Sequence, residues 1–241
     1  MIAEPGRTRA GTVEIGGVTI GYRETGAPED NPVVLLHALG SDARSWDRFA
    51  IALANAGRQA IALDLRGHGV SSRADDYTLE LMLADVLGFL DHRGLRRVDL
   101  VGHSMGGCVA MLAAGLHPGR IRRMVLEDAP PPPMSQTSFW DDLPEPPPEP
   151  PEPVAFDWNL VLPLFRQVRR PDPEWWLRID AIAAPTLVIS GGPTSHIPPE
   201  RLEELAAALP NARMVQIRVG HFVHSTSPER FAEVVLPFLA P

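Results

Sequence analysis

One short stretch, Gly102-His103-Ser104-Met105-Gly106, constrains the fold of this 241-residue chain more than any other part of it. The apolar run at 97–101 predicts a buried strand before this stretch, and the pattern at 108–117 predicts a helix after it. A chain that passes from strand to helix so abruptly must turn sharply at Ser104. That turn strains the serine backbone and projects its hydroxyl above the sheet. The two glycines lack Cβ atoms, so strand and helix can approach closely.

Strand and helix patterns alternate along the rest of the chain. Apolar runs predict strands at 32–36, 59–63, 122–127, 185–190 and 213–219, and helical spacing predicts helices at 45–55, 79–92, 200–208 and 228–239. Two alternating segments within 12–24 flank Gly16-Gly17 and predict a hairpin. This alternation predicts an α/β fold, a mainly parallel sheet with helices on both faces.

Composition excludes several classes of partner. The net charge of −8 argues against nucleic acid and against an anionic membrane. A single cysteine, Cys108, excludes an internal disulfide and fits a reducing compartment. No apolar run approaches the ~20 residues of a membrane span, and residues 1–8 do not look like a signal peptide. We therefore expect a cytoplasmic protein with no nucleic-acid or membrane partner, while the oligomeric state stays open.

Residues that can carry chemistry follow the predicted strands directly. His37, Asp64, Ser104, Asp128 and His221 each stand at such a position. In a parallel sheet the carboxyl ends of the strands lie at one edge, and function gathers there. A serine hydroxyl is a weak nucleophile that needs an adjacent base. Ser104 and a histidine brought to the same edge are therefore candidates for nucleophilic catalysis.

Four segments in this order resemble the α/β-hydrolase superfamily, over about residues 12–239. They are Leu36-His37-Ala38-Leu39-Gly40, the run from Asp64 to Ser71, the stretch around Ser104, and Gly220-His221 before a terminal helix. The resemblance implies an eight-stranded sheet with a cap inserted after the sixth strand. We expect residues 1–129 and 184–241 to form the core. Residues 130–183 would be the cap or lid insertion, which starts with a proline-rich stretch.

The resemblance also implies roles for individual residues. Ser104 would be the nucleophile and His221 its base, with His224 as a weaker candidate for the base. The backbone N–H groups of Leu39 and Met105 would form an oxyanion hole. The family has glycine where this chain has Ala38, a departure that could narrow the space around an acyl group.

The catalytic acid departs from the family pattern. The usual aspartate position after the seventh strand holds Thr194, and the next acid, Glu200, falls in the following helix. One hypothesis moves the acid to Asp128 at the end of the sixth strand, with Glu127 pointing the other way because strand side chains alternate. The other makes Asp128 structural and leaves Ser104 and His221 as a dyad.

The function predicted from these residues is that of a serine hydrolase. It would cleave a small or medium carboxylic ester, lactone or thioester through an acyl-enzyme on Ser104, with a small-molecule acyl substrate, no cofactor and no metal. Candidate substrate-binding residues are His37 (which would also tie down its loop), His103, His196, Trp158 and Trp175. Alternatives on the same fold are a cofactor-free haloperoxidase, a C–C hydrolase, or a non-hydrolytic protein such as a ligand-binding module or a biosynthetic isomerase or lyase.

Overall fold

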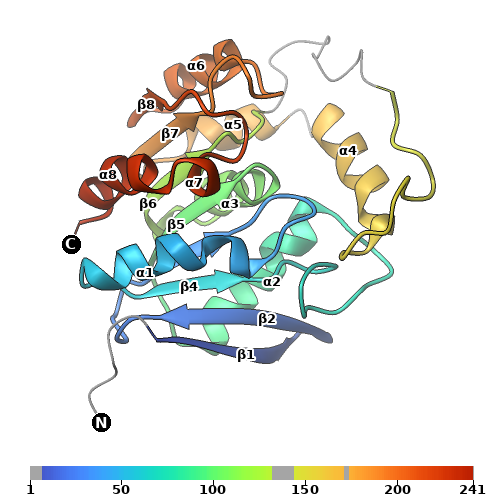
Figure 1. Ribbon diagram of the computed structural model, residues 1–241, viewed down its shortest axis with the longest axis horizontal. Helices are drawn as coiled ribbons and strands as arrows, with labels where there is room; N and C mark the ends of the chain where they lie inside the picture. Colours follow the sequence, from blue (N-terminus) through green and yellow to red (C-terminus); the bar gives the residue numbers. More distant parts are fainter. Residues whose placement is uncertain (1–6, 132–143, 171–173, 241) are drawn as a thin grey trace.

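A computed structural model of the chain describes residues 7–131, 144–170 and 174–240, without the side chains of residues 175–177. It contains an eight-stranded sheet in the order β1-β2-β4-β3-β5-β6-β7-β8 (Figure 1). The strands are β1 (Thr8–Ile15), β2 (Val18–Thr25), β3 (Val33–Leu36), β4 (Ala60–Leu63), β5 (Val98–His103), β6 (Ile121–Glu127), β7 (Thr186–Ser190) and β8 (Ala212–Gln216). β2 pairs antiparallel with β1 and β4, and the other pairs are parallel. The predicted α/β fold with a mainly parallel, eight-stranded sheet is confirmed.

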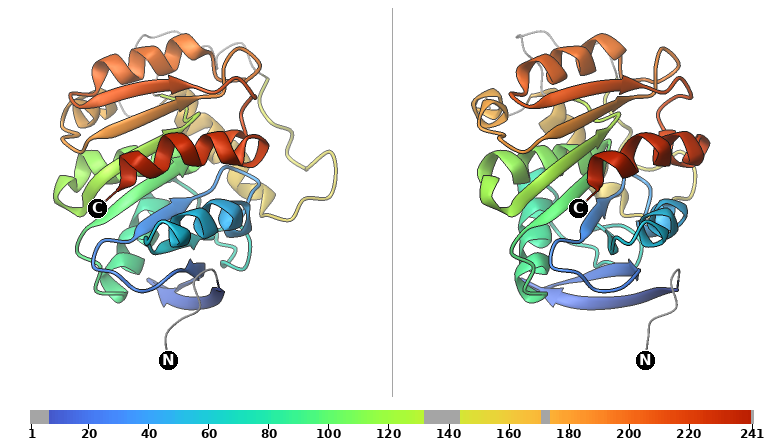
Figure 2. Two further views of the ribbon diagram at one scale, coloured as in Figure 1. Left: turned by 60° about the vertical axis from the view of Figure 1, so that its left-hand side comes forward. Right: turned by 90° about the vertical axis from the view of Figure 1, so that its left-hand side faces the viewer.

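Helices cover both faces of this sheet, as predicted (Figure 2). One face carries α1 (Asp47–Asn55) and α8 (Pro228–Leu239), and the other carries α2 (Leu79–His92), α3 (Met105–Leu116), α5 (Trp175–Asp180) and α6 (Pro199–Ala208). Two apolar clusters fill the spaces between these layers and the sheet. Because β3 and β4 are buried along their whole length, their sequences read as continuous apolar runs.

The β1–β2 hairpin shows how local sequence sets the fold. Gly16 and Gly17 have φ angles of 58° and 87°. A two-residue turn that matches the twist of the flanking strands requires positive φ at both positions, which glycine adopts without strain. The resulting register pairs Ile15 with Val18 and Thr8 with Thr25.

Within the described residues, no helix is long and apolar enough to cross a membrane.

The segment after His221 differs from its prediction. The sequence patterns predict no helix between the strand at 213–219 and the helix at 228–239, but α7 (Val223–Thr226) forms one helical turn there. The backbone N–H of His224 donates to the Glu127 carboxylate at 2.8 Å, which satisfies a donor that the helix start leaves free. That partner lies 97 residues away in the sequence, so no local pattern could reveal it.

The expected insertion at 130–183 separates into two parts. α4 (Val161–Arg169) lies beyond the carboxyl ends of the parallel strands (Figure 1). It is held to the proline-rich segment by an ion pair between Arg166 and Glu145 at 3.0 Å. α5 instead packs on α3: Ile179 is fully buried in the core, and the backbone oxygen of Arg178 lies close to Gly115. Of the described residues, those at 144–170 form the part that lies over the strand ends.

The close contact between α3 and α5 predicts an unusual effect of a helix glycine. A Cβ at Gly115 would lie 2.6 Å from the backbone oxygen of Arg178, so Gly115→Ala should destabilise the fold by about 1–3 kcal/mol through overpacking. Without that contact, alanine in a helix is stabilising by about 0.5–1 kcal/mol.

Urea unfolding of both proteins measures this difference, and Gly119→Ala is the matched control. A Cβ at Gly119 meets nothing within 4 Å, so this variant should stay within about 0.5 kcal/mol of wild type. Equal or higher stability of Gly115→Ala would contradict the packing of α5 on α3.

Candidate active site

Ser104 occupies the sharp turn between β5 and α3. Its φ and ψ are 51° and −117°, a conformation that costs energy for any residue except glycine. The turn is tight because a Cβ at Gly102 would lie 2.4 Å from the backbone oxygen of Gly106. The Ser104 N–H donates to the backbone oxygen of Glu127 at 2.9 Å, which fixes the turn against the neighbouring strand. The strained strand-to-helix turn expected from the sequence is present.

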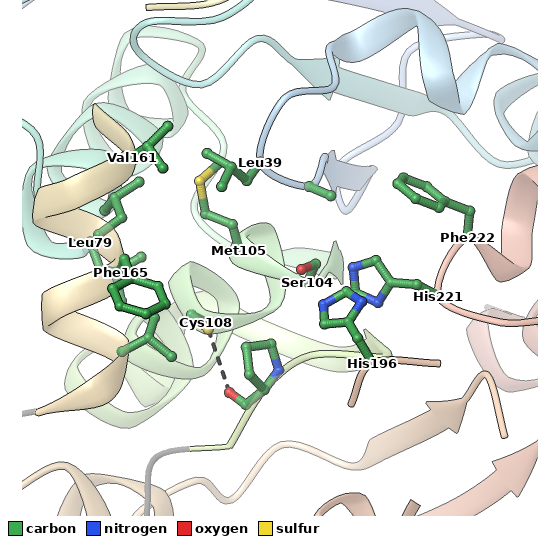
Figure 3. A pocket seen from close by; sticks show the side chains of 14 residues that line it. Leu39, Leu79, Ser104, Met105, Cys108, Val161, Phe165, His196, His221 and Phe222 are labelled. Carbon is green, nitrogen blue, oxygen red and sulfur yellow. Dashed lines mark hydrogen bonds between the residues drawn. The ribbon is translucent and has the colours of Figure 1, made fainter. Parts of the chain in front are cut away.

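Asp128 and His221 come together beside this serine. His221 Nδ1 lies 2.7 Å from Asp128 Oδ2, and the Asp128 side chain is fully buried. Figure 3 shows the His221 ring next to Ser104 in the wall of the same cavity. Asp128 also has a positive φ, 45°, directly after the end of β6. The structure thus brings together the residues of the shifted-acid hypothesis in the order acid, histidine, serine.

The loop after β7 explains how Asp128 is held. The Gly191 N–H donates to Asp128 Oδ1 at 2.7 Å, and the Ser195 hydroxyl donates to Asp128 Oδ2. This loop contains Thr194 at the position where the superfamily usually has its aspartate. Here the loop donates hydrogen bonds to a carboxylate instead of supplying one. The sequence does not reveal this role of Ser195, since a serine in a loop carries no signal of its distant partner.

A cavity of about 290 Å³ opens in front of Ser104 (Figure 3). Its walls are mostly apolar and come from the β3 loop, α2, α3, α4 and the segment after His221. The lining residues are Ala38, Leu39, Leu79, Ser104, Met105, Cys108, Pro130, Val161, Leu164, Phe165, Val168, His196, His221 and Phe222. The Cys108 thiol donates to the Pro130 oxygen at 3.5 Å, and burial raises its pKa to about 12, so it is an apolar wall and not a nucleophile.

His196 lies directly against His221. The two ring centroids are 4.0 Å apart, and both side chains line the cavity. Burial lowers the pKa of His196, and the nearby His221 lowers it further. A neutral His196 is therefore favoured at the cavity wall.

Three other predicted substrate-binding residues lie elsewhere. His37 and His103 are buried, and neither they nor Trp158 belong to the described cavity lining. The Trp158 indole N–H donates to the Pro147 oxygen at 2.9 Å within the cap segment. The side chain of Trp175 lies outside the described residues. Position after a strand or within the cap could not distinguish a residue beside the cavity from one that supports it.

His37 and His68 fix the loop that carries Leu39. His37 Nε2 accepts from the Leu65 N–H at 3.0 Å, and His68 Nε2 accepts from the Gly40 N–H at 3.1 Å. Each ring donates from Nδ1 to a carbonyl, of Ala38 and Arg66 respectively. Burial lowers the pKa of both histidines to about 4, so both rings are neutral. The anchoring role expected for His37 matches these contacts.

The oxyanion-hole candidates are two backbone N–H groups. Met105 is the first residue of α3, where an N–H has no partner inside the helix. Of the backbone hydrogen bonds between described residues, none uses the Leu39 N–H. Leu39 and Met105 both line the cavity that Ser104 also lines. Such a pair suits a developing negative charge on a carbonyl oxygen.

Three buried residues behind the serine offer the atoms of a metal site. Potential ligand atoms of His103, Glu127 and His224 all lie within 4.8 Å of one another. However, His224 Nδ1 is only 2.9 and 2.8 Å from the two Glu127 carboxylate oxygens. Any two ligand atoms of one tetrahedral zinc lie roughly 3.4 Å apart, given bonds of about 2.0–2.2 Å. The shorter distances describe a hydrogen-bonded pair.

Comparison with known proteins agrees with this fold. The profile of the alpha/beta hydrolase fold family matches residues 31–177, and the chain belongs to this family. A hydrolase from Pseudomonas aeruginosa PA01 superimposes with a TM-score of 0.82 and 27% identity, covering 96% of this chain and 98% of the other. The comparisons support an enzyme of the hydrolase class.

Two curated relatives show how far the similarity extends. An sn-1-specific diacylglycerol lipase of Mus musculus is 28% identical over 247 residues, 86% of this chain and 80% of that protein. The dihydrolipoyllysine-residue acetyltransferase component of an acetoin cleaving system from Pseudomonas putida is 41% identical over 114 residues. That match covers 47% of this chain and 30% of the relative, so the chain spans less than a third of the relative's length.

The buried neutral histidines predict a loss of stability in mild acid. The pKa values of His37, His68 and His103 are each lowered from 6.5 to about 4. Between these values the unfolded chain binds protons that the folded chain does not, so stability falls as the pH drops from about 6.5 to about 4. Each histidine contributes up to about 1.4 kcal/mol per pH unit.

Urea unfolding at several pH values measures this slope, and His68→Gln provides the comparison. The glutamine oxygen can still accept from the Gly40 N–H but does not titrate, so the slope should decrease by about one proton equivalent. An unchanged slope in His68→Gln would show that His68 does not contribute.

Proposed function

We propose that the protein is a serine hydrolase that cleaves a small or medium carboxylic ester, lactone or thioester through an acyl-enzyme on Ser104. The observation that carries the proposal is the 2.7 Å hydrogen bond between Asp128 and His221, placed beside Ser104 at an apolar cavity. A histidine oriented by a buried carboxylate and next to a serine is the arrangement that activates a serine hydroxyl.

The proposed reaction proceeds in two halves. Ser104 Oγ attacks the carbonyl carbon while His221 Nε2 takes its proton, and the N–H groups of Leu39 and Met105 stabilise the oxyanion. The tetrahedral intermediate collapses as His221 gives that proton to the leaving oxygen or sulfur. His221 then removes a proton from water as the water oxygen attacks the acyl-enzyme. The acid leaves when the bond between the acyl carbon and Ser104 Oγ breaks, and His221 returns the proton to Ser104 Oγ. Asp128 holds the Nδ1–H of His221 in both halves.

The cavity favours an apolar acyl group of moderate size. Its volume of about 290 Å³ lies at the low end of the range of roughly 300–1,000 Å³ that is common for small-molecule sites. The α4 side chains Val161, Leu164, Phe165 and Val168 close one wall. His196 supplies a polar group close to His221, suited to an oxygen on the leaving-group side. The name of the mouse relative, a diacylglycerol lipase, also supports an ester as substrate.

A fluorophosphonate probe tests the serine directly. Wild type should be labelled and should hydrolyse p-nitrophenyl esters, fastest with butanoate and hexanoate because the cavity is apolar and of limited length. Ser104→Ala should lose labelling and turnover while its melting temperature stays close to that of wild type. A folded wild type that is not labelled and cleaves no ester, lactone or thioester in a substrate panel would contradict the proposal.

The shifted acid has its own test. Asp128→Asn keeps an oxygen for the Gly191 N–H but points an amide N–H₂ at His221, which favours the wrong tautomer. We expect kcat for the preferred ester to fall on the order of 10⁴-fold. Glu200→Gln is the matched control, since this nearest downstream acid lies in the first turn of α6, and its kcat should match wild type. If Asp128→Asn keeps kcat within a few-fold of wild type, the dyad is the correct mechanism.

A further inference from the structure

A second set of buried residues lies behind the proposed catalytic residues. His103 directly precedes Ser104, Glu127 directly precedes Asp128, and His224 follows His221 by three positions. The exposed fractions of His103, Glu127 and His224 are 1%, 0% and 3%. The proposed chemistry uses none of the three, and they do not belong to the described cavity lining. Burying one carboxylate and two imidazoles is costly unless their hydrogen bonds are satisfied in place.

Each member of this set contacts the segment that bears a proposed catalytic residue. His103 Nε2 donates to the backbone oxygen of His221 at 2.9 Å. The Glu127 carboxylate accepts from both the backbone N–H and Nδ1 of His224, which fixes the start of α7. The backbone oxygen of Glu127 accepts from the Ser104 N–H. These bonds connect β5, β6 and the segment after β8 in one buried network.

The alternation of side chains along β6 separates the second set of buried residues from the proposed catalytic residues. Because successive strand residues face opposite sides of a sheet, Glu127 and Asp128 point in different directions from adjacent positions. Asp128 meets His221, and Glu127 meets His224. On its other side the His224 ring stacks on Trp46, with centroids 4.0 Å apart. The segment from His221 to His224 is therefore held at both of its ends.

The protonation states of Glu127 and His103 are also fixed by their surroundings. Burial opposes ionisation of Glu127, but the charge interaction with His224 and the hydrogen bonds from the ring and backbone N–H of His224 lower the pKa of Glu127, so it is a carboxylate. Burial lowers the pKa of His103 to about 4, so its ring is neutral and its single proton sits on Nε2, facing the His221 oxygen. The donor and acceptor directions are fixed, which makes the network specific for one placement of the His221 backbone.

We propose that His103, Glu127 and His224 are positioning residues that hold the His221 segment, so that the His221 imidazole stays between Asp128 and Ser104. This inference rests on the proposed function. A shift of about 1 Å in a catalytic group can cost on the order of 10²-fold in rate. Since the three residues do not contact the substrate cavity, their loss lowers kcat and leaves KM close to its wild-type value.

A matched pair of variants at position 103 tests the positioning role of His103. His103→Gln places an amide N–H₂ near the position of Nε2 and can still donate to the His221 oxygen, whereas His103→Leu has no donor. We expect His103→Gln to stay within about 3-fold of wild-type kcat and His103→Leu to lose about 10- to 100-fold, both with KM within 2-fold. A His103→Leu variant that folds and keeps wild-type kcat overturns the proposal.

A spectroscopic readout separates this proposal from the proposed function. The Nδ1 protons of His221 and His224 each face a buried carboxylate, so each should give a low-field proton resonance. His221→Asn and His224→Asn assign the two. In His103→Leu the His221 resonance should shift or broaden, and in His103→Gln it should remain. If the two His103 variants behave in this way but wild type is not labelled at Ser104, the proposed function fails and the positioning survives. A His221 resonance unaltered in His103→Leu overturns the positioning.

Glu127→Gln provides a second route if His103→Leu does not fold. The glutamine oxygen keeps one acceptor for His224 but loses the negative charge and the second oxygen. We expect about a 10-fold lower kcat with unchanged KM and a lower rate of fluorophosphonate labelling per folded molecule. A lower melting temperature with unchanged kcat and labelling rate would make Glu127 purely structural and overturn its assignment.

Discussion

The pairing of β5 with β6 is the constraint on which the rest of the site depends. Its register sets His103 opposite Glu127, and the Ser104 N–H continues the ladder to the Glu127 oxygen. Of the described non-glycine residues, Ser104 and Asp128 are the two with positive φ, and they directly follow these neighbouring strands. Strain of this kind persists only where the surroundings enforce it. The pairing of these strands offsets the strain of the two turns, and a serine and a carboxylate are thereby placed at adjacent strand ends.

Local patterns carried the fold because they are repeated and short-range. The elbow at Ser104, the glycine pair in the first hairpin and the apolar central strands each follow from residues close in sequence. Asp128 was accessible to the same reasoning, since side-chain alternation at a strand end separates it from Glu127. The resemblance to a family added His221, whose position between a strand and a terminal helix no periodicity would mark.

The remaining features depend on partners far apart in the chain. Ser195 reaches Asp128 across 67 residues, and His224 reaches Glu127 across 97. A histidine at a strand end or in the loop after it looks the same in the sequence whether it lines the cavity, like His221, or is buried outside the cavity lining, like His103. Only the packing of the folded chain decides which histidine lines the cavity, and it buries His103 outside the cavity lining. The same holds for the cap, whose expected range includes a helix that packs into the core.

The environment of His221 shows how the charges at this site divide. Glu127 is the last residue of β6 and Asp128 directly follows it. Each carboxylate is hydrogen-bonded to a different histidine, so the two do not compete for one imidazole. His196 and His103 lie near His221 with lowered pKa values, so neither brings a second positive charge that would oppose an imidazolium. When His221 accepts the serine proton, the buried Asp128 faces the new charge at Nδ1. Because the walls around it are apolar, that single carboxylate acts with little screening from solvent.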